Sequence, residues 1–337
     1  MAPHSPDRPT VITVAKEAGV SIASVSRVLN GIPTSQTVAE RVQEATRRLG
    51  YVPAAAARSL KAGRTYQLAF AVPDISNPVY VEVMRAIEGA TKGSGFRLLV
   101  HSTGSDVADE LDLLESLRRR YVDGLVMTSL RMSDAHLRAI EAAAVPVVVI
   151  GNAQDDFPID SVRTSSKKAV ELAVDHLLES GRKKIGFING PLDTGPGRAR
   201  GEGFVDALAG AGLEDDLCRV EVGEDFTHHA GYEATRRLLE RWSLDGLLCA
   251  NDLIAFGALR ALAEAGIAVP SDTAVVGIDD TDLAAMVTPS LSSVSLGAGE
   301  RGRLAAKLLL ERLADLSLPP RRFEVEPKLV IRESSAR

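Results

Sequence analysis

The sequence predicts an α/β protein with a small all-α head, a short helical linker and a large body of parallel sheets covered by helices. Three observations support this fold class. The first 50 residues hold two short helical patterns separated by a glycine, and a third follows. From Tyr66 onward, short apolar runs alternate with helical patterns, as in parallel sheets with helices on both faces. The head and the body also carry opposite net charges.

The stretch from Val14 to Asn30 is typical of two helices joined by a tight turn. Thr13 and Ser21 are the expected N-caps, because each has an oxygen that can accept from an unpaired backbone N–H. Gly19 lies between them, where the turn needs a left-handed residue that glycine adopts without strain. The pattern predicts a helix-turn-helix, whose second helix enters the major groove of DNA. On spacing alone, a generic helical hairpin is the alternative.

A third helix and a linker follow this motif. Residues 35–49 carry one apolar stripe at helical spacing, and Gly50 ends the helix. Pro53 suits the first position of a new helix, which lasts about two turns before Gly63. A free helix that short is marginal in water. We therefore expect helix or coil according to its surroundings; a passive alanine-rich tether is the alternative.

The charges are unevenly distributed along the chain. Residues 1–62 carry eight basic and four acidic side chains, whereas the whole chain has a net charge of −6, so residues 63–337 carry −10. A basic head on an acidic body fits a module that binds phosphates and a body that DNA repels. A merely solvated basic helix would give a similar count.

The composition excludes other classes of protein. With 337 residues, 45% of them hydrophobic, the chain is long enough for two or three domains with real cores. No apolar run reaches the roughly 18 residues of a membrane span, and the polar N-terminus lacks an apolar signal core. Cys218 and Cys249 lie far apart and match no metal or redox spacing. We expect a cytoplasmic protein with reduced thiols and no membrane partner.

Strand and helix patterns alternate through the body. The expected strands are 68–72, 97–101, 124–127, 147–150, 185–188, 246–249, 274–278 and 323–331. The expected helices are 80–92, 109–119, 134–143, 166–180, 203–211, 229–241, 255–265 and 300–316. Parallel sheets of this kind bind ligands at the carboxyl ends of their strands. The alternation itself leaves open whether the body has one lobe or two.

Several runs of the sequence together form a specific pattern. They are Val14-Ala15, Ala18-Gly19-Val20-Ser21, Val25-Ser26-Arg27-Val28-Leu29-Asn30, Leu49-Gly50-Tyr51-Val52-Pro53 and Ala57-Arg58-Ser59-Leu60. This pattern resembles the LacI/GalR family of bacterial transcription regulators, and the resemblance extends to about Glu333. One departure is Thr13, where the family usually has Asp. Since Thr also caps helices, the expected fold is unchanged.

The resemblance implies a head at residues 10–50, a hinge helix or linker at 51–63 and a two-lobed, periplasmic-binding-protein-like body at 64–333. Three crossovers would join the lobes, with lobe one at about 64–160 plus 290–320 and lobe two at about 161–289 plus 321–333. The hinge helix of the family orders on DNA and inserts a leucine into the minor groove, and Leu60 matches that leucine. The expected DNA-contacting residues are Ser21, Ile22, Ala23, Ser24, Ser26, Arg27, Asn30, Ala57, Leu60 and Lys61.

The sequence holds no recognisable catalytic or metal-binding motif. It lacks a Gly-x-Ser-x-Gly elbow, a Walker loop and a Cys-x-x-Cys pair. His228 and His229 are adjacent, so a helix would point them about 100° apart, which is poor for one metal. Gly195-Pro196-Gly197 fits no dinucleotide fingerprint. We therefore expect no catalytic residue, no cofactor and no metal.

Polar residues gather just past the predicted strand ends. Carboxylate, amide and guanidinium groups near an aromatic ring suit a hydroxyl-rich small ligand, because they pair with hydroxyls while the ring covers an apolar sugar face. The alternative for Asn77, Asp252 and Asp279 is helix capping. The resemblance matches Asn77, Arg200, Phe226, Asn251 and Asp279 to effector-pocket positions. The expected effector-binding residues are Asp74, Asn77, Tyr80, Arg200, Phe226, Asn251 and Asp279.

Together these features predict a cytoplasmic, dimeric, ligand-responsive transcription regulator, expected to be a repressor of a near-palindromic operator, with a sugar-like effector. A purine effector is the first alternative. It is weakened because Thr194 and Pro196 stand where purine-responsive members have Arg and Thr. Gly151 stands where lactose-responsive members carry Asp, so lactose-like inducers are not supported in detail. A sugar-handling α/β enzyme and a periplasmic binding protein are the remaining alternatives.

Overall fold

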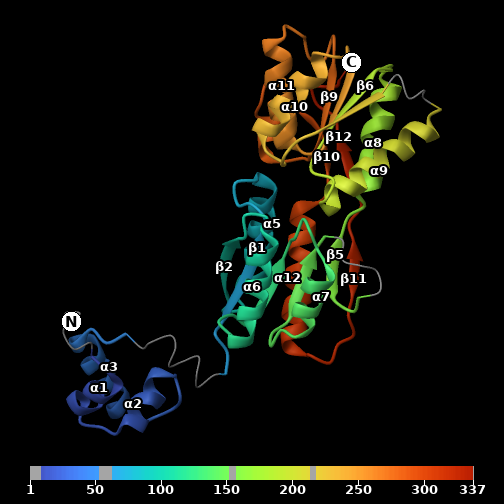
Figure 1. Cartoon of the computed structure of the whole chain (residues 1–337). Coiled ribbons are helices and arrows are strands. Elements are labelled where there is room, and N and C mark those ends of the chain that lie inside the picture. Colours follow the sequence, from blue (N-terminus) through green and yellow to red (C-terminus); the bar gives the residue numbers. More distant parts are fainter. Residues whose placement is uncertain (1–8, 53–62, 152–156, 213–217, 337) are drawn as a thin grey trace, which may run out of the picture. The chain divides into compact units, whose positions relative to one another are not determined.

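The computed structural model describes residues 9–52, 63–151, 157–212 and 218–336. The chain divides into two units, a head within Met1–Thr65 and a body of Tyr66–Arg337 (Figure 1). The predicted hinge contacts Ala57, Leu60 and Lys61 lie outside the described residues.

The described part of the head contains three α-helices: α1 (Val11–Ala18), α2 (Ile22–Leu29) and α3 (Gln36–Leu49). Gly19 has a φ of +60° in the turn between α1 and α2. Ser21 caps α2, since its hydroxyl accepts from the Ser24 N–H at 3.1 Å. The helix-turn-helix predicted from the sequence is therefore confirmed.

The prediction that Thr13 caps α1 is wrong. The helix begins earlier, and its N-cap is Thr10, whose hydroxyl accepts from the Thr13 N–H at 3.3 Å. The Thr13 hydroxyl in turn accepts from the Thr10 N–H at 2.6 Å. This reciprocal pair is a capping box, with Thr13 in its third helical position rather than at the cap.

A small apolar core holds the head together. Val14, Val25 and Val42, one from each helix, are fully buried. The Arg41 guanidinium on α3 also donates to the Gly19 carbonyl at 3.3 Å. The α3 helix is thus fixed against the turn that orients α2.

Lobe one of the body is built on a parallel sheet in the order β11-β5-β4-β3-β1-β2. Its strands are β1 (Gln67–Val72), β2 (Arg97–Ser102), β3 (Gly124–Met127), β4 (Val147–Ile150), β5 (Asp160–Arg163) and β11 (Arg322–Glu324). Its helices are α5 (Pro78–Thr91), α6 (Val107–Ser116), α7 (Asp134–Glu141) and α12 (Ala298–Ala314). Leu68 and Phe70 of β1 pack with α5 and α12, whereas Ala69 and Ala71 pack with α6 and α7. The alternation along β1 shows that helices cover both faces.

Lobe two contains the sheet β12-β10-β9-β8-β6-β7, in which only β12 is antiparallel. Its strands are β6 (Ile185–Asn189), β7 (Cys218–Val222), β8 (Gly246–Cys249), β9 (Ala274–Asp279), β10 (Ser292–Ser295) and β12 (Lys328–Val330). Its helices are α8 (Ser166–Glu179), α9 (Gly195–Gly210), α10 (His228–Leu239) and α11 (Asp252–Glu264).

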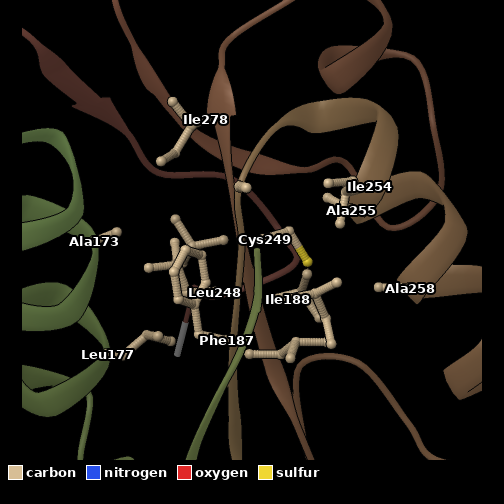
Figure 2. Close-up of a cluster of buried hydrophobic side chains, with 14 of the residues drawn as sticks. Ala173, Leu177, Phe187, Ile188, Leu248, Cys249, Ile254, Ala255, Ala258 and Ile278 are labelled. Atoms are coloured by element: carbon tan, nitrogen blue, oxygen red, sulfur yellow. The ribbon is translucent and has the colours of Figure 1, made fainter. Parts of the chain in front are cut away.

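Both faces of the lobe-two sheet are apolar. Figure 2 shows Phe187 and Leu248 on the side facing α8, and Ile188 and Cys249 on the side facing α11. Cys249 and Cys218 are buried, and neither forms a disulfide bond. Burial raises the pKa of the Cys249 thiol, so this sulfur packs as a small apolar group.

The chain crosses between the lobes later than the predicted boundaries near residues 160, 290 and 320. Strand β5 belongs to lobe one through Arg163, because it pairs with β4 and β11. Strand β10 pairs with β9 in lobe two. The single strand predicted at 323–331 is two strands, β11 in lobe one and β12 in lobe two.

The start of α9 also differs from the prediction, which placed this helix at 203–211. The glycine-rich segment around Pro196 is the first turn of α9, which begins at Gly195 and is capped by Thr194. The Thr194 hydroxyl accepts from the Gly197 N–H at 3.1 Å. Among the described helices, none has the length and apolar character that crossing a membrane requires.

Candidate functional site

A cavity of about 1080 Å³ lies between the two lobes, at the carboxyl ends of the strands. Its size is at the upper end of the range of about 300–1,000 Å³ for small-molecule sites. All seven predicted effector-binding residues line it: Asp74, Asn77, Tyr80, Arg200, Phe226, Asn251 and Asp279. The structure thus gathers side chains that are more than 200 positions apart in the sequence.

Asp279 ends β9 and faces this cavity. It is 6% exposed, and its φ of +116° is unusual for a residue other than glycine. Burial raises the pKa of this carboxyl to about 6, although the positive charges of Arg200 and Arg301 oppose the shift. No described residue donates a hydrogen bond to it or forms an ion pair with it within 4.0 Å. A strained, buried and unpaired carboxylate points to a ligand contact.

Two other carboxylates near Asp279, those of Asp252 and of its sequence neighbour Asp280, have structural roles instead. Asp252 is fully buried and accepts hydrogen bonds from the Thr281 N–H, the Thr281 hydroxyl and the Ser293 hydroxyl. Asp280 pairs with Arg332 at 2.6 Å. Asp252 joins α11 to the neighbouring strand ends, and Asp280 anchors the C-terminal segment.

Two further polar groups reach the cavity from opposite lobes. Arg200 on α9 is 6% exposed, and one of its Nη atoms donates to the Ala250 carbonyl at 2.5 Å. Its Nε is buried without a partner among the described residues. Tyr80 on α5 has a pKa raised by burial and by the negative charge of Asp279. Its phenol therefore stays protonated and can donate a hydrogen bond.

Asn251 caps a helix and also fixes the aromatic wall of the cavity. Its side-chain oxygen accepts from the Ile254 N–H at 2.8 Å, and its Nδ2 donates to the Phe226 carbonyl at 3.0 Å. The Phe226 ring lies against Gly190, where an added Cβ would come within 2.3 Å of the ring. Only glycine at this position lets the ring pack so closely.

Asn77 and Asp74 hold the loop after β1. Asn77 caps α5 by accepting from the Val79 N–H at 3.1 Å. Asp74 accepts from the Ser76 N–H at 2.8 Å and from the Ser76 hydroxyl at 2.7 Å. Helix capping, the alternative weighed for Asn77, is thus its contact here, and both residues form the cavity wall.

The sequence patterns missed a second arginine in the cavity. Arg301 lies in the first turn of α12 and lines the cavity from lobe one. Its Nε is also buried without a partner among the described residues. In the sequence it is one charged residue of an amphipathic helix, and only the second crossing of the chain, between β10 and α12, places that helix beside the cavity.

A cross-lobe contact closes one edge of the cavity and was also missed. Arg131, after β3, pairs with Asp193, after β6, with Nε–Oδ2 and Nη2–Oδ1 distances of 2.7 and 3.3 Å. Next to this pair the Gly195 N–H donates to the Leu130 carbonyl at 2.7 Å. The two lobes therefore meet in this structure.

Buried polar side chains hold the loop that carries Arg131. The Ser133 hydroxyl lies 2.9 Å from His136 Nδ1, and His136 Nε2 lies 2.8 Å from the Glu110 carboxylate. His136 and Glu110 are almost fully buried. This network fixes the start of α7 on α6.

Within the described part of the chain, no group of three or more metal-ligating side chains occurs.

The outer face of α2 carries the predicted DNA contacts of the head. Ser21, Ile22, Ala23, Arg27 and Asn30 are exposed, and Ser24 and Ser26 are half-buried. The Asn30 amide donates to the Ser26 carbonyl of its own helix. The Arg27 guanidinium has no hydrogen bond or ion pair with any described residue, so it is available to a partner.

Comparison with known proteins decides the family. The profile of bacterial regulatory proteins, lacI family, matches residues 10–54, and that of a periplasmic binding protein-like domain matches residues 174–335. The ribose operon repressor of Halalkalibacterium halodurans is 32% identical over 329 residues, covering 97% of this chain and 97% of that protein. The chain belongs to the LacI family.

Solved structures agree over both units of the LacI-family chain. The lac repressor dimer bound to operator and the anti-inducer ONPF has a TM-score of 0.84 at 27% identity, covering 98% of this chain and 99% of that chain. A LacI family regulator from Enterococcus faecium with bound ribose has a TM-score of 0.72 at 29% identity, covering 80% and 98%. The protein is therefore a DNA-binding transcription regulator with a ligand-binding body.

Substitution of Arg27 tests whether α2 of this regulator reads DNA bases. It is the one long charged side chain on α2. If it reads a guanine, Arg27→Ala should weaken binding to the specific operator by about 1–3 kcal/mol and leave binding to random DNA nearly unchanged. Fluorescence anisotropy on both DNAs measures this. Equal weakening on the two DNAs would show that Arg27 contacts only phosphate.

Asp279 gives the body a pH dependence of defined sign. Because its pKa is raised from 3.8 to about 6 on folding, the folded protein holds the proton more tightly. Protonation of Asp279 therefore stabilises the folded state. This stabilisation is fully present below about pH 4 and is lost as the pH rises through about 6. Relative to Asp279→Asn, the unfolding free energy of the wild type should fall by roughly 1–3 kcal/mol over this range. Urea denaturation measures it; a constant difference between the two proteins would contradict the assignment.

Proposed function

We propose that this protein is a cytoplasmic, dimeric repressor of a near-palindromic operator, and that a sugar-like effector in the cavity between the lobes switches its DNA binding. The observation that carries the proposal is the convergence of Asp279, Arg200, Tyr80 and Phe226 on one cavity. They supply an acceptor, a forked donor, a hydroxyl and an aromatic face. That combination suits a ring bearing several hydroxyls.

Two of the relatives and the chemistry of the cavity wall support a sugar over a purine. One is a ribose operon repressor, and one solved relative holds ribose. The Thr194 hydroxyl is already used, since it donates to the Pro191 carbonyl at 2.6 Å and accepts from the Gly197 N–H. Pro196 has no N–H to offer. The two positions expected to read a purine therefore lack free donors.

The switch is proposed to act through the hinge at residues 51–63. A ligand that contacts both lobes stabilises one closure angle over another, and it shifts DNA binding only by its differential affinity for the two states. In a dimer, two hinge helices must pair to stay helical, because each alone is marginal. Leu60 is proposed to enter a minor-groove step at the centre of the operator.

An effector screen tests this function. Calorimetry against a panel of sugars and a panel of nucleobases should find a sugar ligand that changes operator affinity by a factor of roughly 5–150. Asp279→Ala should abolish that response and keep ligand-free DNA binding, because Asp279 lies in the body. Asp112→Ala, which removes an exposed carboxylate of α6, is the matched control and should behave as wild type. Tight purine binding, or sugar binding that leaves DNA affinity unmoved, would reject the proposal.

A further inference from the structure

Two arginines from opposite lobes meet at the cavity. Arg200 comes from α9 in lobe two and Arg301 from α12 in lobe one, and both line it. Burial lowers the pKa of Arg301, and the charge of Arg200 lowers it further, while the negative charge of Asp279 opposes both. The arrangement of the lobes in this structure therefore brings two like charges to one cavity, and their repulsion disfavours this arrangement.

Neither guanidinium has a carboxylate partner in the described part of the chain. The Nε atoms of both are buried without a hydrogen-bond acceptor, and no described carboxylate oxygen lies within 4.0 Å of either. Other arginines of the body are paired: Arg312 with Asp160 at 2.9 Å and Arg332 with Asp280 at 2.6 Å. Leaving donors and charge buried without partners is costly, so the site is incomplete without a ligand.

The acidic groups around the two arginines leave a positive charge in excess. Asp279 faces both, and its pKa of about 6 shows that their charges only partly offset its burial. Glu82 faces Arg301, but its carboxylate accepts from the Gly299 N–H at 3.1 Å. Tyr80 stays neutral. One carboxylate thus stands in the cavity against two guanidinium groups.

The remaining carboxylates that line the cavity are engaged elsewhere or exposed. Asp193 pairs with Arg131, and Glu202 pairs with Lys167. Asp74 accepts from Ser76, Asp225 accepts from the Thr227 N–H at 2.8 Å, and Glu224 lies exposed on the same loop. Solvent screens these rim charges more than the buried arginines.

We propose that the effector is an anionic sugar, whose carboxylate or phosphate group is bound jointly by Arg200 and Arg301. This inference rests on the proposed function and narrows it. The planar fork of a guanidinium matches both kinds of anion with two parallel hydrogen bonds. An anion held by one arginine of each lobe also removes the repulsion between the lobes. Asp279 and Tyr80 then form hydrogen bonds with the sugar hydroxyls, and the Phe226 ring covers the apolar face of the sugar ring.

Matched ligand pairs test the anion directly. Calorimetry on the full-length protein compares glucuronate with glucose and galacturonate with galactose, and also glucose 6-phosphate with glucose and ribose 5-phosphate with ribose. At least one acid or phosphate should bind roughly tenfold or more tightly than its neutral partner, as expected for charge-assisted hydrogen bonds. The carboxylate and phosphate arms distinguish the two kinds of anion.

Variants of Arg301 test whether this residue causes the preference for an anionic ligand. Arg301→Met keeps most of the side-chain length and should reduce the preference for the anion to near onefold, whereas Arg301→Lys should keep part of it. Arg303→Met, on the exposed face of the same helix, is the matched control and should keep all of it. Thermal melting checks that each variant is folded.

The outcomes separate this inference from the proposed function. A neutral sugar that binds as tightly as its acid and phosphate forms, and that shifts operator affinity, overturns the anion and leaves the proposed function standing. An anion preference that survives in Arg301→Met overturns the role of Arg301. Failure of every sugar, neutral or anionic, to bind overturns both.

Discussion

The structure depends on the burial of charged side chains where two lobes meet. Asp279 and Arg200 are buried in the cavity, the Nε atom of the half-buried Arg301 is buried there too, and the charges of all three are not matched by direct contacts. Such a site is stable only because the two sheets that carry it are independently well packed, with Phe70 and Phe187 fully buried in their cores. The packing of the two sheets thus offsets the cost of burying polar groups in the cavity, where a ligand would supply their missing hydrogen-bond and charge partners.

The three crossings of the chain link the two lobes that line the cavity. Each lobe contains segments from distant parts of the sequence, so β11 and α12 of lobe one follow strands of lobe two. Contacts such as Arg131–Asp193 and the Gly195–Leu130 hydrogen bond join the lobes at the cavity edge. A ligand there therefore acts on the relation between the lobes rather than on one loop.

The sequence predicted the elements that follow simple periodicity. Apolar runs identified β1, β3, β4, β6, β8 and β9, and the helix-turn-helix followed from Gly19 and Ser21. Strands β5 and β10 were missed because they are polar: Asp160 and Ser293 are buried in them, and both are hydrogen-bonded. The predicted start of α1 was wrong because Thr10 and Thr13 both have a hydroxyl that can cap a helix.

The candidate site was predictable only where polar residues follow apolar strands. Asp279 and Asn251 stand directly after such runs, so position in the chain indicated them. Arg301 and Arg131 carry no such signal. The first lies on a helix that a crossing brings to the cavity, and the second becomes informative only through Asp193 in the other lobe.

The central claim is that one ligand between the lobes and one DNA site at the head are thermodynamically coupled. The most direct measurement is the operator affinity with and without the tightest-binding sugar, together with the affinity for that sugar with and without operator. The account predicts two equal ratios, each about 5–150, because coupling between two binding sites is reciprocal. Ratios of one in both experiments, with both ligands bound, would contradict it.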